Sequence, residues 1–156
     1  MENMYVFISH KKEDGVTAHE IYDEFRRLGV NSYLDLLDSN LTGGKELTEH
    51  IKEQLNKCTD IIVVMSEQTK KSWWVPFEIG MSAQVDMPTA SFLKSNVELP
   101  DYLLYWPRLK YISDIDTYVR TRKEIGWKML NEHFDQRSNK AFETRLFYDE
   151  LKRKLR

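Results

Sequence analysis

Apolar residues follow two distinct patterns along the chain. The runs at 4–8 and 61–65 are apolar at every position, which is typical of strands buried on both faces of a sheet. Other segments carry apolar residues at helical spacing, first at Ala18, Ile21, Phe25 and Leu28. Gly29 follows this segment and is a common helix-ending residue. The alternation of the two patterns is typical of βαβ units and predicts a mainly parallel sheet.

Further strands are expected from shorter apolar runs at 32–36, 89–93 and 109–112. A second helix is predicted before the strand at 61–65, with one face formed by Leu47, Ile51, Leu55 and Cys58. Parallel strands joined by right-handed crossovers give a doubly wound, flavodoxin-like α/β sheet of five strands, order 2-1-3-4-5, with helices on both faces. Ligands bind such three-layer folds beyond the carboxyl ends of the strands, where strands 1 and 3 diverge.

Two helices are predicted after the sheet. The first is expected to be capped by Ser113 or Asp114 and to turn these apolar residues inward: Ile115, Tyr118, Val119 and Ile125. The last helix begins at about Asn139, and its predicted inner face consists of Phe142, Leu146, Leu151 and Leu155. Both helices are additions to the five-stranded fold.

Length and composition fit one domain. A chain of 156 residues that is 41% hydrophobic and 31% charged has room for one sizeable core and not for a second domain of normal size. We expect a single domain over 1–156, made of a core at 4–112 and a helical extension at 113–156. The one cysteine, Cys58, has no intramolecular disulfide partner, and its place on a predicted helix face indicates core packing.

The sequence predicts a cytoplasmic protein that is not associated with a membrane. No apolar stretch approaches the roughly 20 residues that a membrane span needs. The N-terminus also lacks the basic and then apolar regions of a leader peptide. A single cysteine is consistent with a reducing compartment.

Charge is spread unevenly along the chain. Residues 137–156 contain seven Lys or Arg against three Asp or Glu, a local charge of 7 − 3 = +4 in a chain of net charge −2. A basic helix can bind nucleic acid, but basic residues near a helix C-terminus also complement the helix macrodipole. Because no nucleic-acid motif accompanies these residues, we do not expect nucleic acid as a partner.

Three short runs carry residues suited to chemistry: YVFISH at 5–10, YLD at 33–35 and SWWVPFE at 72–78. Their order and spacing resemble the Toll/interleukin-1 receptor (TIR) domain family, and in particular its bacterial, NAD-consuming branch. The resemblance extends from about residue 4 to about residue 112. It implies the same five-stranded fold that the apolar pattern predicts.

Glu78 is the candidate catalytic residue, and it has two interpretations. Pro76 favours the first position of a helix, so a structural role for Glu78 is to stabilise the helix N-terminus. In NAD-cleaving TIR domains the glutamate at this motif position contacts the nicotinamide-side ribose and is required for cleavage. A fixed carboxylate stabilises an oxocarbenium-like transition state. The resemblance therefore implies that Glu78 is catalytic. Trp74, four positions earlier, shares its helix face if the helix begins before Pro76, whereas Pro76 itself favours a later start.

The resemblance assigns further residues to the substrate site. Ser9 ends the first strand, and His10 and Lys11 follow it; the Lys11-Lys12 pair is also compatible with a solvated loop. His10 is expected to stack or to form hydrogen bonds. Asp35 corresponds to the acid that ends strand 2 in the family, and a role as a loop anchor is equally open.

The segment 37–45 corresponds to the BB loop of the family, which closes over the site or docks onto a neighbouring subunit. Thr42 and Gly44 lie in this loop. The resemblance therefore implies self-association through TIR–TIR contacts. The remaining histidines, His19, His50 and His133, are expected in exposed helical positions, and no metal site is expected.

Two functions from different classes are consistent with these motifs. The first is an enzyme that cleaves NAD⁺, its substrate rather than a cofactor, to nicotinamide and either ADP-ribose or a cyclic isomer. By resemblance to Thoeris-type anti-phage systems, the product would be an immune signal for a downstream effector. The second is a non-catalytic scaffold that binds other TIR domains. The presence of Glu78 favours the enzyme, and Met65-Ser66 at the end of strand 3 argues against a phospho-accepting receiver.

Overall fold

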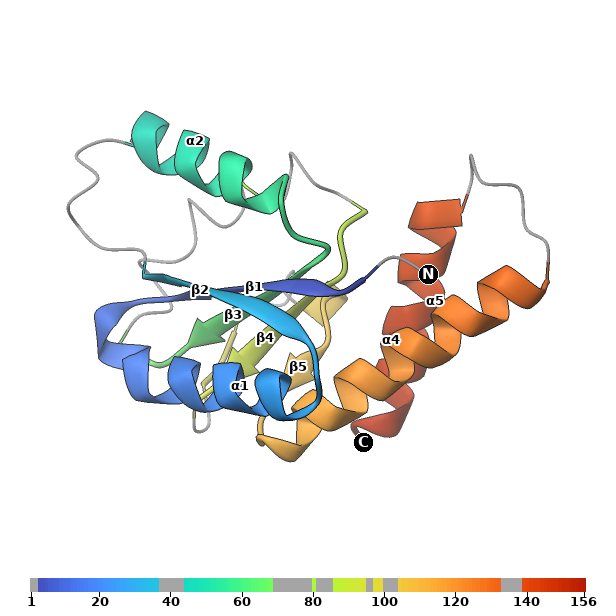
Figure 1. The fold of residues 1–156 in the computed structure, drawn as a ribbon. Coiled ribbons are helices and arrows are strands. Elements are labelled where there is room, and N and C mark those ends of the chain that lie inside the picture. The colour runs from blue at the N-terminus through green and yellow to red at the C-terminus, as the bar shows by residue number, and fades with distance from the viewer. Residues whose placement is uncertain are drawn as a thin grey trace.

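The computed structural model describes residues 3–36, 44–68, 80, 86–94, 97–99, 104–132 and 139–156 (Figure 1). The helices and strands follow one another in this order: β1 (Tyr5–His10), η1 (Lys12–Asp14), α1 (Gly15–Arg27), β2 (Asn31–Leu36), α2 (Gly44–Leu55), β3 (Asp60–Met65), β4 (Thr89–Leu93), β5 (Arg108–Leu109), α4 (Ser113–Asn131) and α5 (Asn139–Lys154). The five predicted strands and the helices predicted before 61–65, after the first strand and after the sheet are present among them. The start of the helix expected near Pro76 lies outside the described residues. None of the helices in these ranges is both long enough and apolar enough to cross a membrane.

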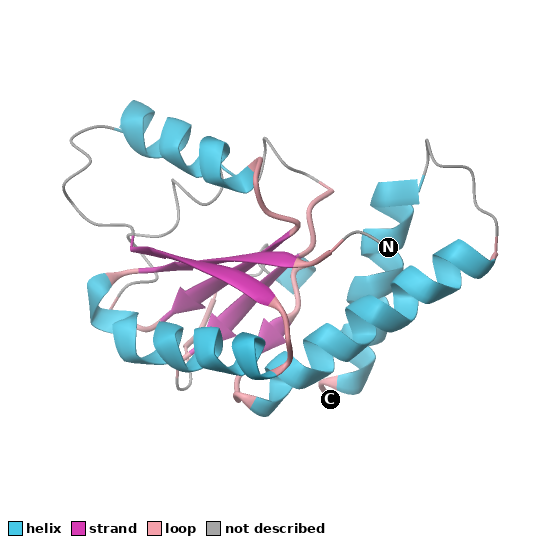
Figure 2. Ribbon diagram, viewed as in Figure 1, coloured by secondary structure: helices cyan, strands magenta, loops and turns pink. Residues whose placement is uncertain are grey.

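The sheet is parallel throughout, with the strand order β2-β1-β3-β4-β5 that the crossover rule predicts. Helices cover both of its faces, as Figure 2 shows: α2 lies on one side, and α1, α4 and α5 lie on the other. The fold is therefore a flavodoxin-like, three-layer α/β fold with additional C-terminal helices. Because the strands are parallel, all their carboxyl ends lie at one edge of the sheet.

The central strands bury side chains on both faces. In β3, Ile62 and Val64 belong to the core that the sheet shares with α1, α4 and α5. Ile61, Val63 and Met65 belong to the core on the α2 side. Every residue of this strand is buried, and each large apolar side chain contributes about 1.5–3 kcal/mol by leaving water. The prediction that the apolar run at 61–65 is a strand buried on both faces is therefore confirmed.

Cys58 lies in the core on the α2 side, just before β3. It does not lie on the face of the second helix as predicted, because α2 ends at Leu55. Burial raises the pKa of its thiol to about 11. The thiol therefore stays protonated near neutral pH and is a poor nucleophile. The prediction that Cys58 is a packing residue is confirmed.

Gly29 ends α1 as the sequence predicts. Its φ is +73°, a left-handed conformation that glycine adopts without steric cost. The amide of Gly29 donates to the carbonyl of Arg26 (3.0 Å), and the amide of Val30 donates to that of Phe25 (2.9 Å). These two bonds form a Schellman motif, and Val30 and Phe25 are both buried in the same core. The chain is thereby turned directly into β2.

The last strand differs from its prediction. β5 covers only Arg108–Leu109 instead of 109–112. The amides of Lys110 and Tyr111 donate to Asp114 Oδ2, at 2.8 and 2.9 Å, and are therefore not available to the sheet. The predicted cap is also wrong, because Ile112 occupies the N-cap position of α4 and no side chain caps it. Asp114 instead holds the turn that leads into the helix.

The two C-terminal helices pack together, and one residue of the predicted inner face is wrong. In α4 the four predicted inward residues are buried. In α5 the buried stripe consists of Thr144, Phe147, Tyr148 and Leu151. Phe142 lies two positions before this stripe begins, which places it on a different side of the helix, and it is 39% exposed. Leu146 and Leu155 are partly buried at the margin of the core.

A buried ion pair attaches α4 to the amino-terminal edge of the sheet. Asp60, the first residue of β3, is fully buried. Its carboxylate accepts hydrogen bonds from the Tyr118 hydroxyl (2.6 Å) and from Arg122 Nε (2.7 Å). Burial and the nearby Asp60 charge raise the pKa of Tyr118 well above its ordinary value, so its phenol remains a donor. Such pairing compensates the cost of a buried charge.

Candidate functional site

Ser9 and Asp35 lie side by side at the carboxyl ends of β1 and β2. The strands are parallel, and their register pairs Ser9 with Asp35 and His10 with Leu36. Ser9 was predicted to end strand 1 and belongs to β1. His10 was predicted to follow the strand, whereas it also belongs to β1 because this pairing extends to its end. Ser9 is 4% exposed and Asp35 is 5% exposed. The structure thus brings together two of the residues that the TIR resemblance assigns to the substrate site.

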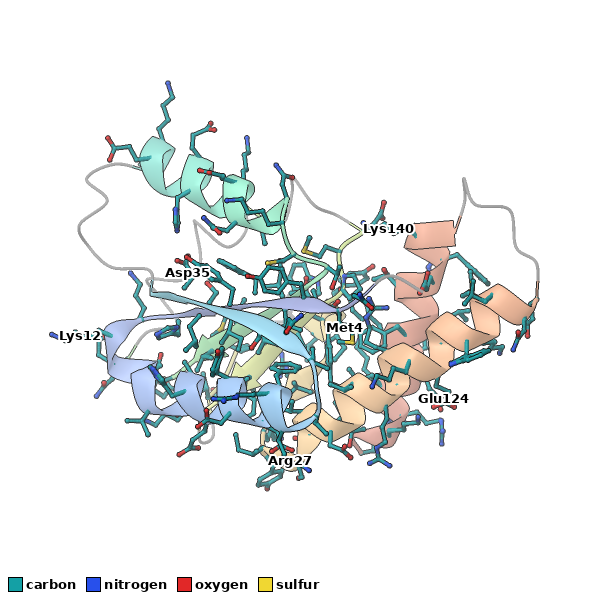
Figure 3. The ribbon with its side chains drawn as sticks, viewed as in Figure 1. Met4, Lys12, Arg27, Asp35, Glu124 and Lys140 are labelled. Carbon is teal, nitrogen blue, oxygen red and sulfur yellow. The ribbon has the colours of Figure 1, made fainter. Side chains whose placement is uncertain are left out.

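The Ser9 and Asp35 side chains face α2. Two positions earlier on each strand, Phe7 and Tyr33 stack with their ring centroids 6.1 Å apart, and both belong to the core on the α2 side. Side chains alternate along a strand, so Ser9 and Asp35 project from the same face. Figure 3 shows Asp35 on the side of the sheet that α2 covers.

Asp35 is bound by a histidine that the sequence did not assign to the site. His50 Nε2, on α2, lies 3.1 Å from each of the two carboxylate oxygens of Asp35. His50 lies in a helix as predicted, but its side chain is 30% exposed and so is partly buried instead of exposed. One signal was available: residue 50 follows Leu47 by three positions, which puts it on the predicted apolar stripe.

His10 lies on the opposite face of the sheet from Ser9, because the two residues are adjacent in β1. It is 4% exposed, and among the described residues its Nδ1 atom has no hydrogen-bond partner. Burial lowers the pKa of His10 below its ordinary value of 6.5, while the Ile8 backbone and the carboxylates of Asp35 and Asp14 oppose that shift. The ring is therefore neutral near pH 7 and has both a donor and an acceptor nitrogen.

The remaining predicted site residues lie near this edge or outside the described ranges. Lys11 is partly buried between β1 and η1, and Lys12, exposed, begins η1. Gly44 is the first residue of α2. The other predicted residues lie outside the described residues: Thr42, Trp74 and Glu78. Gly80, two positions after Glu78, is helical and buried.

The described part of the site is suited to binding hydroxyl and amide groups. It combines a buried carboxylate, a serine hydroxyl and two imidazoles near the carboxyl ends of β1 and β2. Within the described residues, no three side chains of His, Cys, Asp or Glu converge as a metal site requires. Folds of this class bind ligands at this edge.

A family model for the TIR domain matches residues 6–123. The chain belongs to the TIR domain family. The match includes nearly all of YVFISH at 5–10 and all of the runs at 33–35 and 72–78, and it continues into the first half of α4. The TIR domain thus extends some way past residue 112, where the sequence resemblance was expected to end.

The chain is also similar to a protein of Cytobacillus dafuensis, TIR2, which is provisionally named a cyclic ADP-D-ribose synthase. The two are 27% identical over 85 residues. That alignment covers 51% of this chain and 22% of the relative. The TIR domain described here therefore corresponds to a small part of that longer protein.

Proposed function

We propose that this TIR protein cleaves NAD⁺ at the bond between nicotinamide and ribose. The observation that carries the proposal is the run SWWVPFE at 72–78, which lies within the family match and resembles the motif that holds the catalytic glutamate of NAD-cleaving members. In this proposal Glu78 is that glutamate. The name of the similar TIR2 protein supports the same chemistry. A purely scaffolding TIR domain needs no acid at this position.

In the proposed reaction the C1′–N bond breaks and its electron pair leaves with nicotinamide. The ribosyl group becomes cationic, and the Glu78 carboxylate stabilises that charge. Water then adds to C1′ and loses a proton, which gives ADP-ribose. Alternatively, a nitrogen of the adenine moiety adds to C1′ and gives a cyclic isomer.

The other residues assigned to the site have supporting roles in this proposal. Asp35 and Ser9, buried side by side, position substrate hydroxyl groups. His10 offers a neutral imidazole on the other face of the sheet. Lys11 or Lys12 binds the pyrophosphate. Trp74, Thr42 and Gly44 also belong to the proposed substrate site. Self-association through residues 37–45 completes the active site in this proposal.

The product is proposed to act as a signal. A cyclic ADP-ribose isomer made during infection would switch on a downstream effector in anti-phage defence of the Thoeris type. The TIR2 name supports a cyclic product. The proposed location is the cytoplasm, where NAD⁺ is abundant. NAD⁺ is the substrate, and no metal or other cofactor is required in this scheme.

The decisive test is liquid chromatography of NAD⁺ incubated with the wild type and with Glu78→Gln at high protein concentration. We expect nicotinamide from the wild type and a loss of roughly 10²–10³-fold in the variant, because the amide cannot stabilise a cation. Glu132→Gln, an exposed glutamate just after α4, is the matched control and should keep full activity. Equal turnover by the wild type and Glu78→Gln would contradict the proposal, and no turnover by any protein would favour the scaffold.

A further inference from the structure

A buried carboxylate and a histidine from another element are held together at the carboxyl edge of the sheet. Asp35 is near the end of β2 and His50 is in α2, fifteen positions later. Among the described residues, His50 is the hydrogen-bond partner of the Asp35 side chain. The contact therefore connects the two elements that flank residues 37–43 in the sequence.

The chemistry of a carboxylate assigns the proton of this contact to His50. An ionised carboxylate can only accept hydrogen bonds, so His50 Nε2 must donate. The distance to each carboxylate oxygen is the same, 3.1 Å, so one N–H is shared between both oxygens. A shared donor at this distance orients the carboxylate and leaves part of its accepting capacity unused.

The unused capacity contrasts with the surroundings of the buried Asp60. The Asp60 carboxylate accepts hydrogen bonds from Thr59, from Tyr118 and from two atoms of Arg122, at 2.6 to 3.1 Å. Asp35 has no comparable set of donors among the described residues. A buried carboxylate with a single shared donor can still accept a hydroxyl hydrogen from a ligand.

We propose that His50 is a positioning residue, which holds the Asp35 carboxylate beside Ser9 so that it accepts a hydrogen bond from a substrate hydroxyl. The inference rests on the proposed NAD⁺ cleavage and adds a residue to it. His50 itself does not touch the reacting atoms in this scheme. Its effect passes through Asp35, because Asp35 is the group that it contacts and that the register places next to Ser9.

The first arm of the test asks whether the hydrogen-bond donor at position 50 is what matters. His50→Leu removes the donor, whereas His50→Gln replaces Nε2 with an amide nitrogen at a similar distance along the side chain. We expect His50→Leu to lower kcat/KM roughly 10- to 100-fold, as misplacement of a site group does, and His50→Gln to restore most of it. His19→Leu is the control, because His19 is an exposed histidine whose ring contacts the carbonyl of Gly15 within α1. Equal loss in both His50 variants would overturn the proposal.

The second arm tests whether His50 acts through Asp35. In an Asp35→Ala background, His50→Leu should cause no further loss of kcat/KM. If the two losses multiplied instead, His50 would act independently and the proposal would be wrong. Circular dichroism and urea unfolding establish that each variant is folded under assay conditions.

A third readout separates this inference from the proposed function. The ¹⁵N NMR spectrum of the His50 ring should show a proton on Nε2 in the wild type, and that signature should change in Asp35→Ala. A wild type that shows the signature but consumes no NAD⁺ would sink the proposed function, and the catalytic positioning with it. A wild type that consumes NAD⁺ while His50→Leu matches its kcat/KM would overturn the positioning role alone.

Discussion

Two buried aspartates lie at opposite edges of the same parallel sheet. Asp60 begins β3 at the amino-terminal edge, and Asp35 lies next to the end of β2 at the carboxyl-terminal edge. Each is 5% exposed or less. Their surroundings differ in kind: Asp60 meets an arginine, a tyrosine and a threonine, whereas Asp35 meets one histidine among the described residues.

The difference separates a structural acid from an acid available to a ligand. A buried charge that is paired and fully hydrogen-bonded joins elements together, as Asp60 joins β3 to α4. A buried acid with few donors is unfavourable for stability alone, and such groups are concentrated at functional sites. His10, with an unpartnered Nδ1 among the described residues, lies near the end of the sheet where Asp35 lies.

The largest expected effect comes from breaking the pair at the amino-terminal edge. Arg122→Met keeps most of the side-chain volume but leaves the Asp60 charge uncompensated, so we expect the free energy of unfolding to fall by about 3–5 kcal/mol. Urea unfolding followed by circular dichroism measures this change. A loss below about 1 kcal/mol, typical of an exposed ion pair, would remove the distinction between the two aspartates.

The corresponding change at the other edge should affect activity more than stability. Asp35→Ala is expected to reduce NAD⁺ turnover, but less than Glu78→Ala does, because its proposed role is positioning. The free energy of unfolding should change by about 0.5–1.5 kcal/mol, since one hydrogen bond to a partly exposed histidine is lost. Chromatography of NAD⁺ and urea unfolding of both variants decide the ranking. Complete loss of turnover in folded Asp35→Ala would show that the ranking is wrong.

The smallest expected effect is a pH dependence at His10. Burial lowers its pKa in the folded state below 6.5, so the unfolded chain binds this proton more tightly and acid favours unfolding. The neutral ring's full contribution to stability is therefore present above about pH 6.5, and it is lost as the pH falls from there toward the folded-state pKa. The slope is at most about 1.4 kcal/mol per pH unit.

The His10→Gln variant has no imidazole to titrate at this position. Comparing it with the wild type therefore separates the effect of His10 from that of the carboxylates that titrate in acid. The difference in unfolding free energy between wild type and variant should shrink between pH 7.5 and pH 5.5. The groups that influence His10, namely His19 and Asp14 near α1 and Asp35 on β2, are unchanged in the variant. A difference that stays constant over this range would contradict the lowered pKa.

Much of the fold could be predicted from the sequence because its determinants are local. The apolar runs at 4–8 and 61–65 and the glycine at 29 are features of consecutive residues, and the handedness of crossovers then leaves few strand orders. The errors arose where the pattern was weak. At β5, Asp114 competes for two backbone amides, and in α5 two apolar residues, Phe142 and Phe147, could each begin the inner face.

The sequence by itself determined the family, the order of the strands and the candidate acids, because each depends on residue types at short spacing. Only the tertiary structure decided which polar side chains meet. His50 reaches Asp35 because α2 packs over the end of β2, and Arg122 reaches Asp60 across 62 positions because α4 packs against the start of β3. It also separated Ser9 from His10, since neighbouring residues in a strand face opposite sides. Contacts between elements depend on how whole elements pack, and no short stretch of sequence records that packing.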